Sequence, residues 1–445
     1  MEIPESVKKI IRTLESSGCS AYAVGGCVRD KMMGIEPHDW DLCTSALPEQ
    51  VLSALGSHNV IESGLKHGTV TVKVDGQLYE ITTFRTDGEY LDNRRPESVT
   101  FVTSVEDDLS RRDFTINAMA YNPKDGLIDL FGGMDDISSK TIRCVGDAEK
   151  RFEEDALRIL RALRFSSRLG FEIEPGTLEA AKKKAYLLKN ISAERIASEL
   201  LMILDGEYAP MVLLDQTEIL SVILPEIKAM IGFLQYNPHH IYDVWQHTVK
   251  VVEYSPHGKV YRLAALMHDI GKPACFTRDE KGIGHFHGHP ELSAEMAVKI
   301  MKRLKLDNNT ISEVREIILY HDRRPPADKK GVRKFISGVG KDRYLSILRL
   351  KRADAKAQNP AMLEDKLHYI DELERICEEL TENGEEFSLR TLKINGKDLI
   401  SIGISEGRQI GTVLHYLLDL VVEGTVENDH EVLMQEAKKY AATHN

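Results

Sequence analysis

The stretch from Gly25 to Asp41 constrains the N-terminal part of this chain more than any other segment. It predicts a glycine turn, Gly25-Gly26, that opens a short helix, followed by a strand that begins Asp39-Trp40-Asp41. Successive side chains of a strand point to opposite faces, so we expect the two aspartates to point to the same side. Paired carboxylates of this kind offer oxygen ligands that suit Mg²⁺.

The glycine turn adds a place for an anion to the same site. Glycine lets the backbone N–H groups at a helix N-terminus approach a phosphate, so Gly26 is a candidate nucleotide-binding residue. Arg29 lies one turn into this helix and offers a planar, permanently charged group. A lone Asp-x-Asp or a lone Gly-Gly is usually a solvated turn, but the two at this spacing predict a nucleotidyl-transfer site.

The combined motif Gly-Gly-x-x-Arg-Asp and Asp-x-Asp resembles the nucleotidyltransferases of the DNA polymerase β superfamily, and most closely the class II CCA-adding tRNA nucleotidyltransferases. The resemblance implies an α+β fold, in which a mixed-sheet nucleotidyltransferase head precedes an all-helical neck, HD domain and tail. It also implies that Asp39 and Asp41 are catalytic and bind Mg²⁺. Glu80, on a predicted strand over residues 78–84, is either a third metal carboxylate or an ordinary exposed strand residue.

A second block, Arg-Arg-Asp-Phe-Thr-Ile-Asn-Ala from residue 111, resembles a motif with which the same family contacts the nucleotide. The resemblance implies that Arg112 binds the triphosphate and that Asp113 receives the ribose hydroxyls. Taken alone, two arginines beside an aspartate would indicate a solvated helix start.

From about residue 150 the pattern becomes helical, and residues 151–169 are predicted as one helix with arginines beside its apolar face. Asp155 and Arg158 lie one helical turn apart in this prediction. The carboxylate can accept a hydrogen bond from the exocyclic amine of C or A, and the guanidinium can donate one to the adjacent ring nitrogen. U and G present the opposite polarity and would leave both groups unpaired. The family carries Glu-Asp-x-x-Arg in this role, and Arg161 and Arg164 match arginines that it places around the nucleotide. The alternative is a solvated basic face with a Glu154–Arg158 pair.

A separate series of histidines and aspartates lies between residues 237 and 355. A single histidine is more often packed than a ligand, but adjacent His268-Asp269 in an apolar helix needs partners. The series resembles the HD phosphohydrolases in their His-Asp-Ile-Gly form, whose pattern selects His289 over His285 and His287. Imidazole and carboxylate ligands suit Mn²⁺, Ni²⁺, Fe²⁺ or Co²⁺, and a metal-bound hydroxide would attack a phosphoester. The implied metal ligands are His247, His268, Asp269, His289, His321 and Asp354.

Length and charge set the organisation and the class of partner. A chain of 445 residues is expected to form several domains, and its net charge of −12 argues against indiscriminate nucleic-acid binding. No apolar run is long enough to span a bilayer, the start is neither a signal nor a transit peptide, and six cysteines lack a C-x-x-C pair. We therefore expect a cytoplasmic protein with no membrane and no protein partner. The predicted domains are a catalytic head (1–140), a neck with the nucleotide-selecting helix (141–230), an HD-type metal-binding domain (231–360) and a helical tRNA-binding tail (361–445).

These observations predict a CCA tRNA nucleotidyltransferase that extends tRNA 3′ ends from CTP and ATP without a nucleic-acid template. Transfer would proceed in line with two metal ions and release pyrophosphate, with a second, phosphohydrolase activity as an added hypothesis. A-adding, CC-adding and poly(A)-adding enzymes share the motifs and remain alternatives, although the loop at 87–96 argues weakly against CC-only addition. An HD metal-dependent phosphohydrolase whose head merely binds RNA is the alternative from another class.

Overall fold

The computed structural model describes residues 1–56, 60–61, 68–87, 99–382, 389, 391–404 and 407–444. The chain divides into two compact units, Met1–Pro225 and Glu226–Asn445, and each is described by itself. The four narrower domains expected from the sequence remain predictions. Most of the loop at 87–96 lies outside the described residues.

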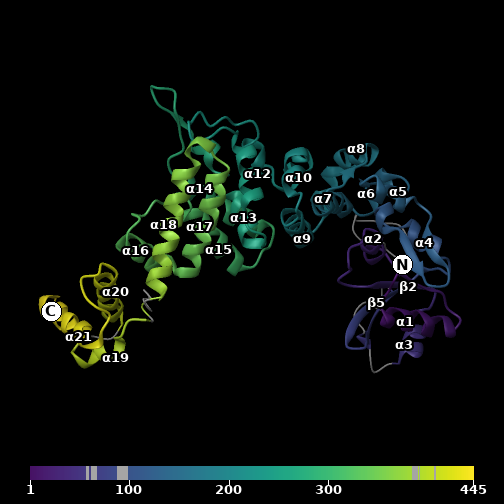
Figure 1. Ribbon diagram of the computed structural model, residues 1–445, viewed down its shortest axis with the longest axis horizontal. Coiled ribbons are helices and arrows are strands. Elements are labelled where there is room, and N and C mark those ends of the chain that lie inside the picture. Colours follow the sequence, from purple (N-terminus) through teal and green to yellow (C-terminus); the bar gives the residue numbers. More distant parts are fainter. Residues whose placement is uncertain are drawn as a thin grey trace. The chain divides into compact units, whose positions relative to one another are not determined.

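The N-terminal unit is built on one seven-stranded mixed sheet (Figure 1). Strands β2 and β5 run parallel, whereas all other neighbours in this sheet are antiparallel, which confirms the predicted α+β class. The parallel pairing brings Asp41 of β2 into register with Glu80 of β5. In sheet order the strands are β3 (Val60–Ile61), β4 (Thr69–Val74), β5 (Gln77–Thr83), β2 (Asp41–Thr44), β1 (Ala21–Val24), β8 (Met119–Asn122) and β9 (Gly126–Asp129).

Helices cover both faces of this sheet, and the side chains of β1 point alternately into the apolar core on each face. Ala21 and Ala23 belong to an apolar core shared with α1 (Glu5–Ser16), α2 (Gly26–Met32) and α3 (Pro48–Leu55). Tyr22 and Val24 belong to a second core, shared with α4 (Val105–Ser110). Burial of both faces fixes the strand register, because a slip of one residue would exchange the two sets of side chains.

Three elements differ from the expectations. Strand β2 begins at Asp41, so Asp39 lies in the bend before it and not within the strand. The sequence Ile142-Arg-Cys-Val predicts a strand that closes the head sheet, but β10 (Thr141–Ile142) pairs with β11 (Glu172–Ile173) in a separate sheet. The single helix predicted over 151–169 is broken into α6 (Ala148–Glu154) and α7 (Leu157–Leu169). Asp155 is extended there (φ −137°, ψ 102°), and its carboxylate accepts from the N–H of Leu157 at 3.0 Å.

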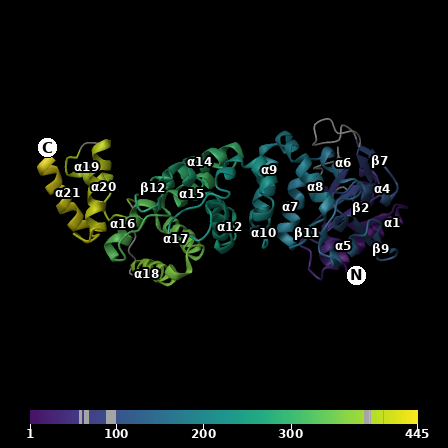
Figure 2. The ribbon, with the colours of Figure 1, turned by 90° about the horizontal axis from the view of Figure 1, so that it is seen from above.

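The rest of the N-terminal unit is mainly helical, and Figure 2 shows its helices side by side next to α7. Helix α7 packs against α9 and α10, which gives its arginines protein partners on one flank. The further elements are β6 (Arg85–Asp87), β7 (Val99–Phe101), α5 (Gly133–Ser138), α8 (Pro175–Lys184), α9 (Ala193–Leu204), α10 (Ala209–Asp215) and α11 (Thr217–Ile223).

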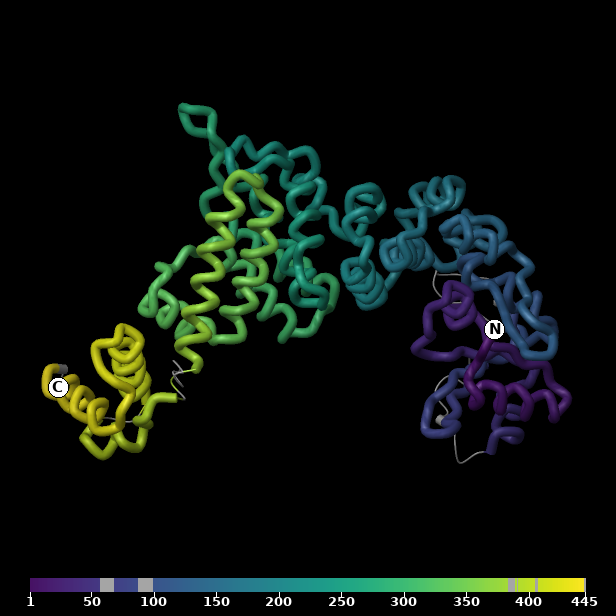
Figure 3. The backbone as a smooth tube through the Cα atoms, in the orientation of Figure 1, coloured from purple at the N-terminus to yellow at the C-terminus, as the bar shows by residue number. Residues whose placement is uncertain are grey.

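The described part of the C-terminal unit is helical apart from one short hairpin, β12 (Thr277–Arg278) with β13 (Gly284–His285), which projects from the helices in Figure 3. Helix α12 packs on α13 and α17, and α14 packs on α15. None of the described helices of the protein is long and apolar enough to cross a membrane. The helices are α12 (Val244–Tyr254), α13 (Lys259–Met267), α14 (His289–Arg303), α15 (Asn308–Tyr320), α16 (Lys329–Val339), α17 (Lys341–Lys356), α18 (Leu363–Glu382), α19 (Gly396–Ser401), α20 (Arg408–Val422) and α21 (His430–His444).

Candidate active site and metal centre

Three carboxylates gather at the start of β2. Asp41 opens the strand, Asp39 precedes it by two residues, and Glu80 lies beside Asp41 in register on β5. All three side chains are exposed. The pKa of Asp41 is raised to about 6, first because the surrounding protein displaces water from its carboxylate and then because Asp39 and Glu80 add negative charge. A divalent cation would relieve this repulsion, and a donor set made only of carboxylate oxygens fits Mg²⁺.

The glycine turn lies against Arg112, as the nucleotide-site prediction requires. Gly25 has φ +81°, and a Cβ built there would lie 3.0 Å from Nη1 of Arg112. Arg112 Nη2 donates to Oδ2 of the fully buried Asp108 at 3.1 Å, which fixes the guanidinium next to the turn. The start of α2 at Gly26 and the Arg112 side chain therefore share one corner of the head.

Arg29 is less accessible than its predicted role as a phosphate ligand suggests. Only 3% of the residue is exposed, and its guanidinium donates to Oδ1 of Asp30 at 2.9 and 2.6 Å and to Oδ1 of Asn117 at 2.7 Å. These contacts tie the helix after the glycine turn to the motif that follows Arg112. In this state Arg29 holds the turn in place.

Asp113, predicted to receive ribose hydroxyls, is buried, and its side chain accepts three hydrogen bonds from the protein. Its Oδ1 accepts from the N–H of Phe114 and from Nδ2 of Asn117, and its Oδ2 accepts from Nε of Arg161 at 2.7 Å and forms an ion pair with Nη2 at 2.5 Å. Burial acts to raise the pKa of Asp113, but the charge and hydrogen bonds of Arg161 outweigh it and lower the pKa to about 2. Arg161 is thus bound to Asp113, and both lie close to the nucleotide motif.

Asp155 and Arg158, the predicted base-selecting pair, are each held by other residues. Asp155 Oδ2 accepts from Nη2 of Arg195 at 2.7 Å. Arg158 Nη1 donates to Glu154 Oε2 at 2.6 Å, and its Nη2 donates to the carbonyl of Arg111 at 3.1 Å. The Glu154–Arg158 pair of the alternative interpretation is therefore present. The structure places Asp155 at the break between α6 and α7 and Arg158 in the first turn of α7, and each has a charged protein partner of its own.

The ring of Phe165 lies against the guanidinium groups of three arginines near the predicted nucleotide site. Its ring centroid lies 5.2 Å from the guanidinium carbon of Arg29, 5.5 Å from that of Arg161 and 4.6 Å from that of Arg164. Arg164 also donates to Oε1 of Glu199 at 3.1 Å. Sequence reasoning does not find the supporting roles of these partners, because Phe165 fits the apolar spacing of α7 and no local sequence pattern links Arg195 or Glu199 to the arginines of α7.

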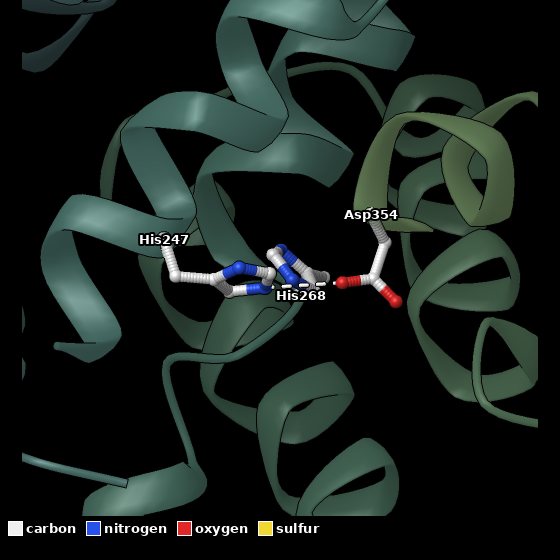
Figure 4. Close-up of side chains that lie close together, drawn as sticks. All are labelled: His247, His268 and Asp354. Carbon is white, nitrogen blue, oxygen red and sulfur yellow. Dashed lines mark ion pairs between the residues drawn. The ribbon is translucent and has the colours of Figure 1, made fainter. Parts of the chain in front are cut away.

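In the C-terminal unit all six predicted metal ligands converge (Figure 4 shows three of them). His247 Nε2 lies 3.0 Å from Oδ1 of Asp354 and 3.4 Å from Oδ2 of Asp269, and His268 Nε2 lies 3.1 Å from the same Asp269 oxygen. The other Asp269 oxygen lies 3.4 Å from Nε2 of His289 and 3.9 Å from Nε2 of His321. Asp269 therefore joins two ligand groups, His247–His268–Asp354 and Asp269–His289–His321.

The backbone orients the histidines of this cluster. Nδ1 of His268, His289 and His321 donates to a carbonyl three residues earlier, at 2.8, 2.8 and 2.6 Å, and Nδ1 of His247 contacts the carbonyl of Ala357 at 3.3 Å. Each Nε2 therefore points inward, the arrangement by which proteins present imidazole to a metal. Among the described residues, Nε2 of His247 and of His268 and both oxygens of Asp269 are buried without a well-aligned hydrogen bond. These buried nitrogen and oxygen atoms without hydrogen-bond partners are suited to be the ligands of a bound cation.

Charge within the cluster is unevenly distributed. Burial and the charge of His268 lower the pKa of His321 to about 3, whereas Asp269 and Asp354 outweigh burial and raise the pKa of His247 to about 9. Lys272, which sequence reasoning did not select, is buried with Nζ 2.7 Å from Oδ2 of Asp269. Its position three residues after Asp269 in His-Asp-Ile-Gly-Lys was the available signal.

A cavity of about 310 Å³ opens onto this cluster and is lined by Asp269, His289, His321 and Asp354 among others. His285 lines the cavity too, but it pairs with Asp279 at 3.0 Å and stacks on His287. The structure thus brings His289, and not His285, to Asp269.

Comparisons with known proteins match the chain along most of its length. The model of the "Poly A polymerase head domain" matches residues 21–143, and that of the "Probable RNA and SrmB-binding site of polymerase A" matches residues 170–231. A model of tRNA nucleotidyltransferase domain 2 matches residues 276–437.

Full-length relatives agree with these models. A CCA-adding enzyme of Geobacillus stearothermophilus is 37% identical over 426 residues, which cover 95% of this chain and 93% of the relative. A CCA-adding enzyme of Leuconostoc mesenteroides is 34% identical over 439 residues, with 98% and 96% covered. The crystal structure of the Bacillus stearothermophilus CCA-adding enzyme in complex with CTP is similar with a TM-score of 0.74 at 31% identity, and the match covers 100% of this chain and 99% of that one.

Proposed function

Because the chain belongs to the family of CCA-adding nucleotidyltransferases, it is an enzyme that completes tRNA 3′ ends from CTP and ATP, and we propose that the site around Asp39 and Asp41 performs this reaction with magnesium. The observation that carries the proposal is the cluster of Asp39, Asp41 and Glu80, in which displacement of water by the surrounding protein, and then the charges of Asp39 and Glu80, raise the pKa of Asp41. The family implies dependence on a divalent metal; the identity of the ion is part of the proposal.

In this mechanism the residues of the head bind and orient the nucleotide. Asp39 and Asp41, with Glu80 beside them, hold the metal, while the turn at Gly26 and the guanidinium of Arg112 hold the triphosphate. The tRNA 3′-hydroxyl oxygen attacks the α-phosphorus and forms a phosphodiester bond, its proton passes to water, and the bond between the α-phosphorus and the bridging oxygen breaks so that pyrophosphate leaves. Bound magnesium lowers the pKa of the 3′-hydroxyl and neutralises charge on the departing pyrophosphate.

Base selection is assigned to Asp155 and Arg158, supported by Arg161 and Arg164. For the first two residues to meet the edge of C or A, Asp155 has to exchange Arg195, and Arg158 has to exchange Glu154, for the base. Charged partners at 2.6–2.7 Å keep both groups satisfied before the nucleotide arrives. This exchange explains how Asp155 and Arg158 can select the base although neither group is an unpaired buried charge in the structure.

Substitutions in the two units separate the proposed activities. Asp39→Ala should abolish addition of CMP and AMP to tRNA and leave metal binding in the C-terminal unit unchanged. His268→Ala should retain nucleotide addition and serves as the matched control, since it removes a metal ligand of the other unit. Addition by Asp39→Ala at the wild-type rate would refute the assignment of the active site.

A second function, metal-dependent phosphohydrolysis, is favoured by the orphaned Nε2 atoms of His247 and His268. We propose that the six-residue cluster, with His289, His321, Asp269 and Asp354, holds Mn²⁺, Ni²⁺, Fe²⁺ or Co²⁺. Metal content should fall in His268→Ala and stay constant in Asp39→Ala. Equal metal content in all three proteins would refute the cluster as a metal site. We further expect the enzyme to act in the cytoplasm, in keeping with tRNA as its substrate.

A further inference from the structure

A second cavity of the C-terminal unit contains a buried lysine next to the histidine–aspartate cluster. The cavity measures about 390 Å³, within the range of small-molecule sites, and Lys351 of α17 lines it. Only 9% of Lys351 is exposed, and among the described residues it has neither a hydrogen bond nor an ion pair. An ammonium group in such surroundings is costly unless an anion reaches it.

The nearest carboxylate of the cluster does not serve as that anion, because it already has partners. Asp354 lies 3.0 Å from Nε2 of His247, and both of its oxygens accept from Nε2 of Gln358 at 2.9 Å. Gln358 in turn accepts from Nζ of Lys366. The chain Lys366–Gln358–Asp354 therefore leaves Lys351 without a contacting counterion in the described part of the unit.

The other lining residues define what the cavity can accept. Arg324 and Lys366 add positive charge, while Asp322 and Asp365 are exposed acidic residues of the lining. Apolar groups supply the remaining wall, where an organic group attached to an anion would pack; they are Pro325, Pro326, Ala327, Ala355, Tyr369 and Ile370.

We propose that Lys351, assisted by Arg324 and Lys366, forms a subsite for the phosphate group of a phosphate ester. Asp322, Arg324, Asp354 and Gln358 line both this cavity and the one that opens onto the cluster, so a ligand held at Lys351 lies beside the proposed metal site. The choice of phosphate over carboxylate rests on the proposed phosphohydrolase function. Burial lowers the pKa of Lys351 to about 8, and the charges of Asp354 and Asp322 offset only part of this effect, which agrees with a missing counterion.

The test follows Lys351 directly in the full-length, chelator-treated enzyme labelled with ¹³C at lysine Cε. The Lys351 resonance is identified by its absence from Lys351→Met or, should that variant not fold, from Lys351→Arg. Inorganic phosphate is then titrated at constant ionic strength, with acetate as the competing anion. Lys356, an exposed residue of the same helix, is the matched control.

The proposal predicts a saturable shift of the Lys351 resonance with phosphate, half-complete at a concentration at least about tenfold below that of acetate, and no shift for Lys356. No shift of Lys351 with phosphate, or equal shifts with phosphate and acetate, would overturn it. A separate calorimetric titration with Mn²⁺ tests the metal site. Failure of Mn²⁺ to bind, with the phosphate shift intact, would refute the metal proposal and leave the phosphate subsite standing.

Discussion

Replacement of Arg161 by methionine should destabilise the N-terminal unit, because it leaves a buried carboxylate without its cation. Asp113 is 7% exposed, and its Oδ2 accepts from Nε of Arg161 at 2.7 Å and forms an ion pair with Nη2 of Arg161 at 2.5 Å. Its remaining donors are the N–H of Phe114 and Nδ2 of Asn117, both uncharged. Methionine preserves most of the aliphatic stem, so the change removes mainly the charge and the hydrogen bonds.

The magnitude follows from the pKa of Asp113, which is about 2 in the folded protein against an ordinary value of 3.8. This difference corresponds to about 2.5 kcal/mol of folding free energy at neutral pH. Removal of one partner of a buried ion pair costs about 3–5 kcal/mol. We therefore expect the free energy of unfolding to fall by about 2–4 kcal/mol.

The sign of the pH dependence distinguishes this explanation from loss of packing. In the wild type the contribution of Asp113 is fully present above pH 3.8 and is lost as the pH falls towards 2. In Arg161→Met, burial without the cation raises the pKa of Asp113 above its ordinary value. As the pH falls, protonation of Asp113 removes the unpaired buried charge from the variant. The difference in free energy of unfolding between the variant and the wild type should therefore shrink between pH 7 and pH 4.

Urea denaturation followed by tryptophan fluorescence measures the effect. The chain has two tryptophans, so a Trp245→Phe background leaves Trp40 as the reporter of the N-terminal unit. Arg168→Met, an exposed arginine of the same helix, is the control and should change stability by less than about 0.5 kcal/mol. A loss for Arg161→Met no greater than for Arg168→Met, or a difference that does not vary with pH, would refute the reasoning.

Three further substitutions test the nucleotide site by initial rates. Phe165→Leu removes the aromatic ring that three guanidinium groups contact, and it should lower kcat/KM about tenfold for both CTP and ATP. An unchanged kcat/KM would show that the ring does not position the arginines. Gly25→Ala forces a side chain into φ +81° and towards Arg112, so thermal melting should show a loss of about 1–2 kcal/mol together with reduced addition, and wild-type behaviour in both would contradict the close approach. Asp155→Asn turns an acceptor into a donor and should raise the use of UTP relative to CTP about tenfold, whereas unchanged selectivity would exclude Asp155 as the reader.

The features that could be predicted from sequence are those in which neighbours along the chain act together. Local backbone chemistry predicts the glycine turn and the helix after it. It also predicts the hairpin at Asp75-Gly76, and both of these hairpin residues have positive φ in the structure. The convergence of the six histidines and aspartates could be predicted although they lie on several helices, because each lies within a short recognisable motif; their role as metal ligands stays a prediction. The mixed sheet of the head was predicted from the resemblance to the nucleotidyltransferases, and the structure confirms it.

Long-range pairings could not be predicted in this way. Arg29 meets Asn117 across 88 residues, and Asp113 meets Arg161 across 48, without any local pattern that announces the contact. The break between α6 and α7 was missed because apolar spacing continues across it, while the carboxylate of Asp155 competes for the backbone. Lys351, which has no ion pair among the described residues, likewise stands out only once the residues that line its cavity are known.

The most direct test of CCA addition uses three tRNA substrates that end at the discriminator base, at C and at CC. Each is incubated with the full-length enzyme, Mg²⁺ and one labelled nucleotide at a time: CTP, ATP, UTP or GTP. We predict CMP addition to the first two substrates, a single AMP on the third, and negligible use of UTP and GTP. Addition to the CC end alone, long A tracts, or no incorporation by folded enzyme would contradict the assignment.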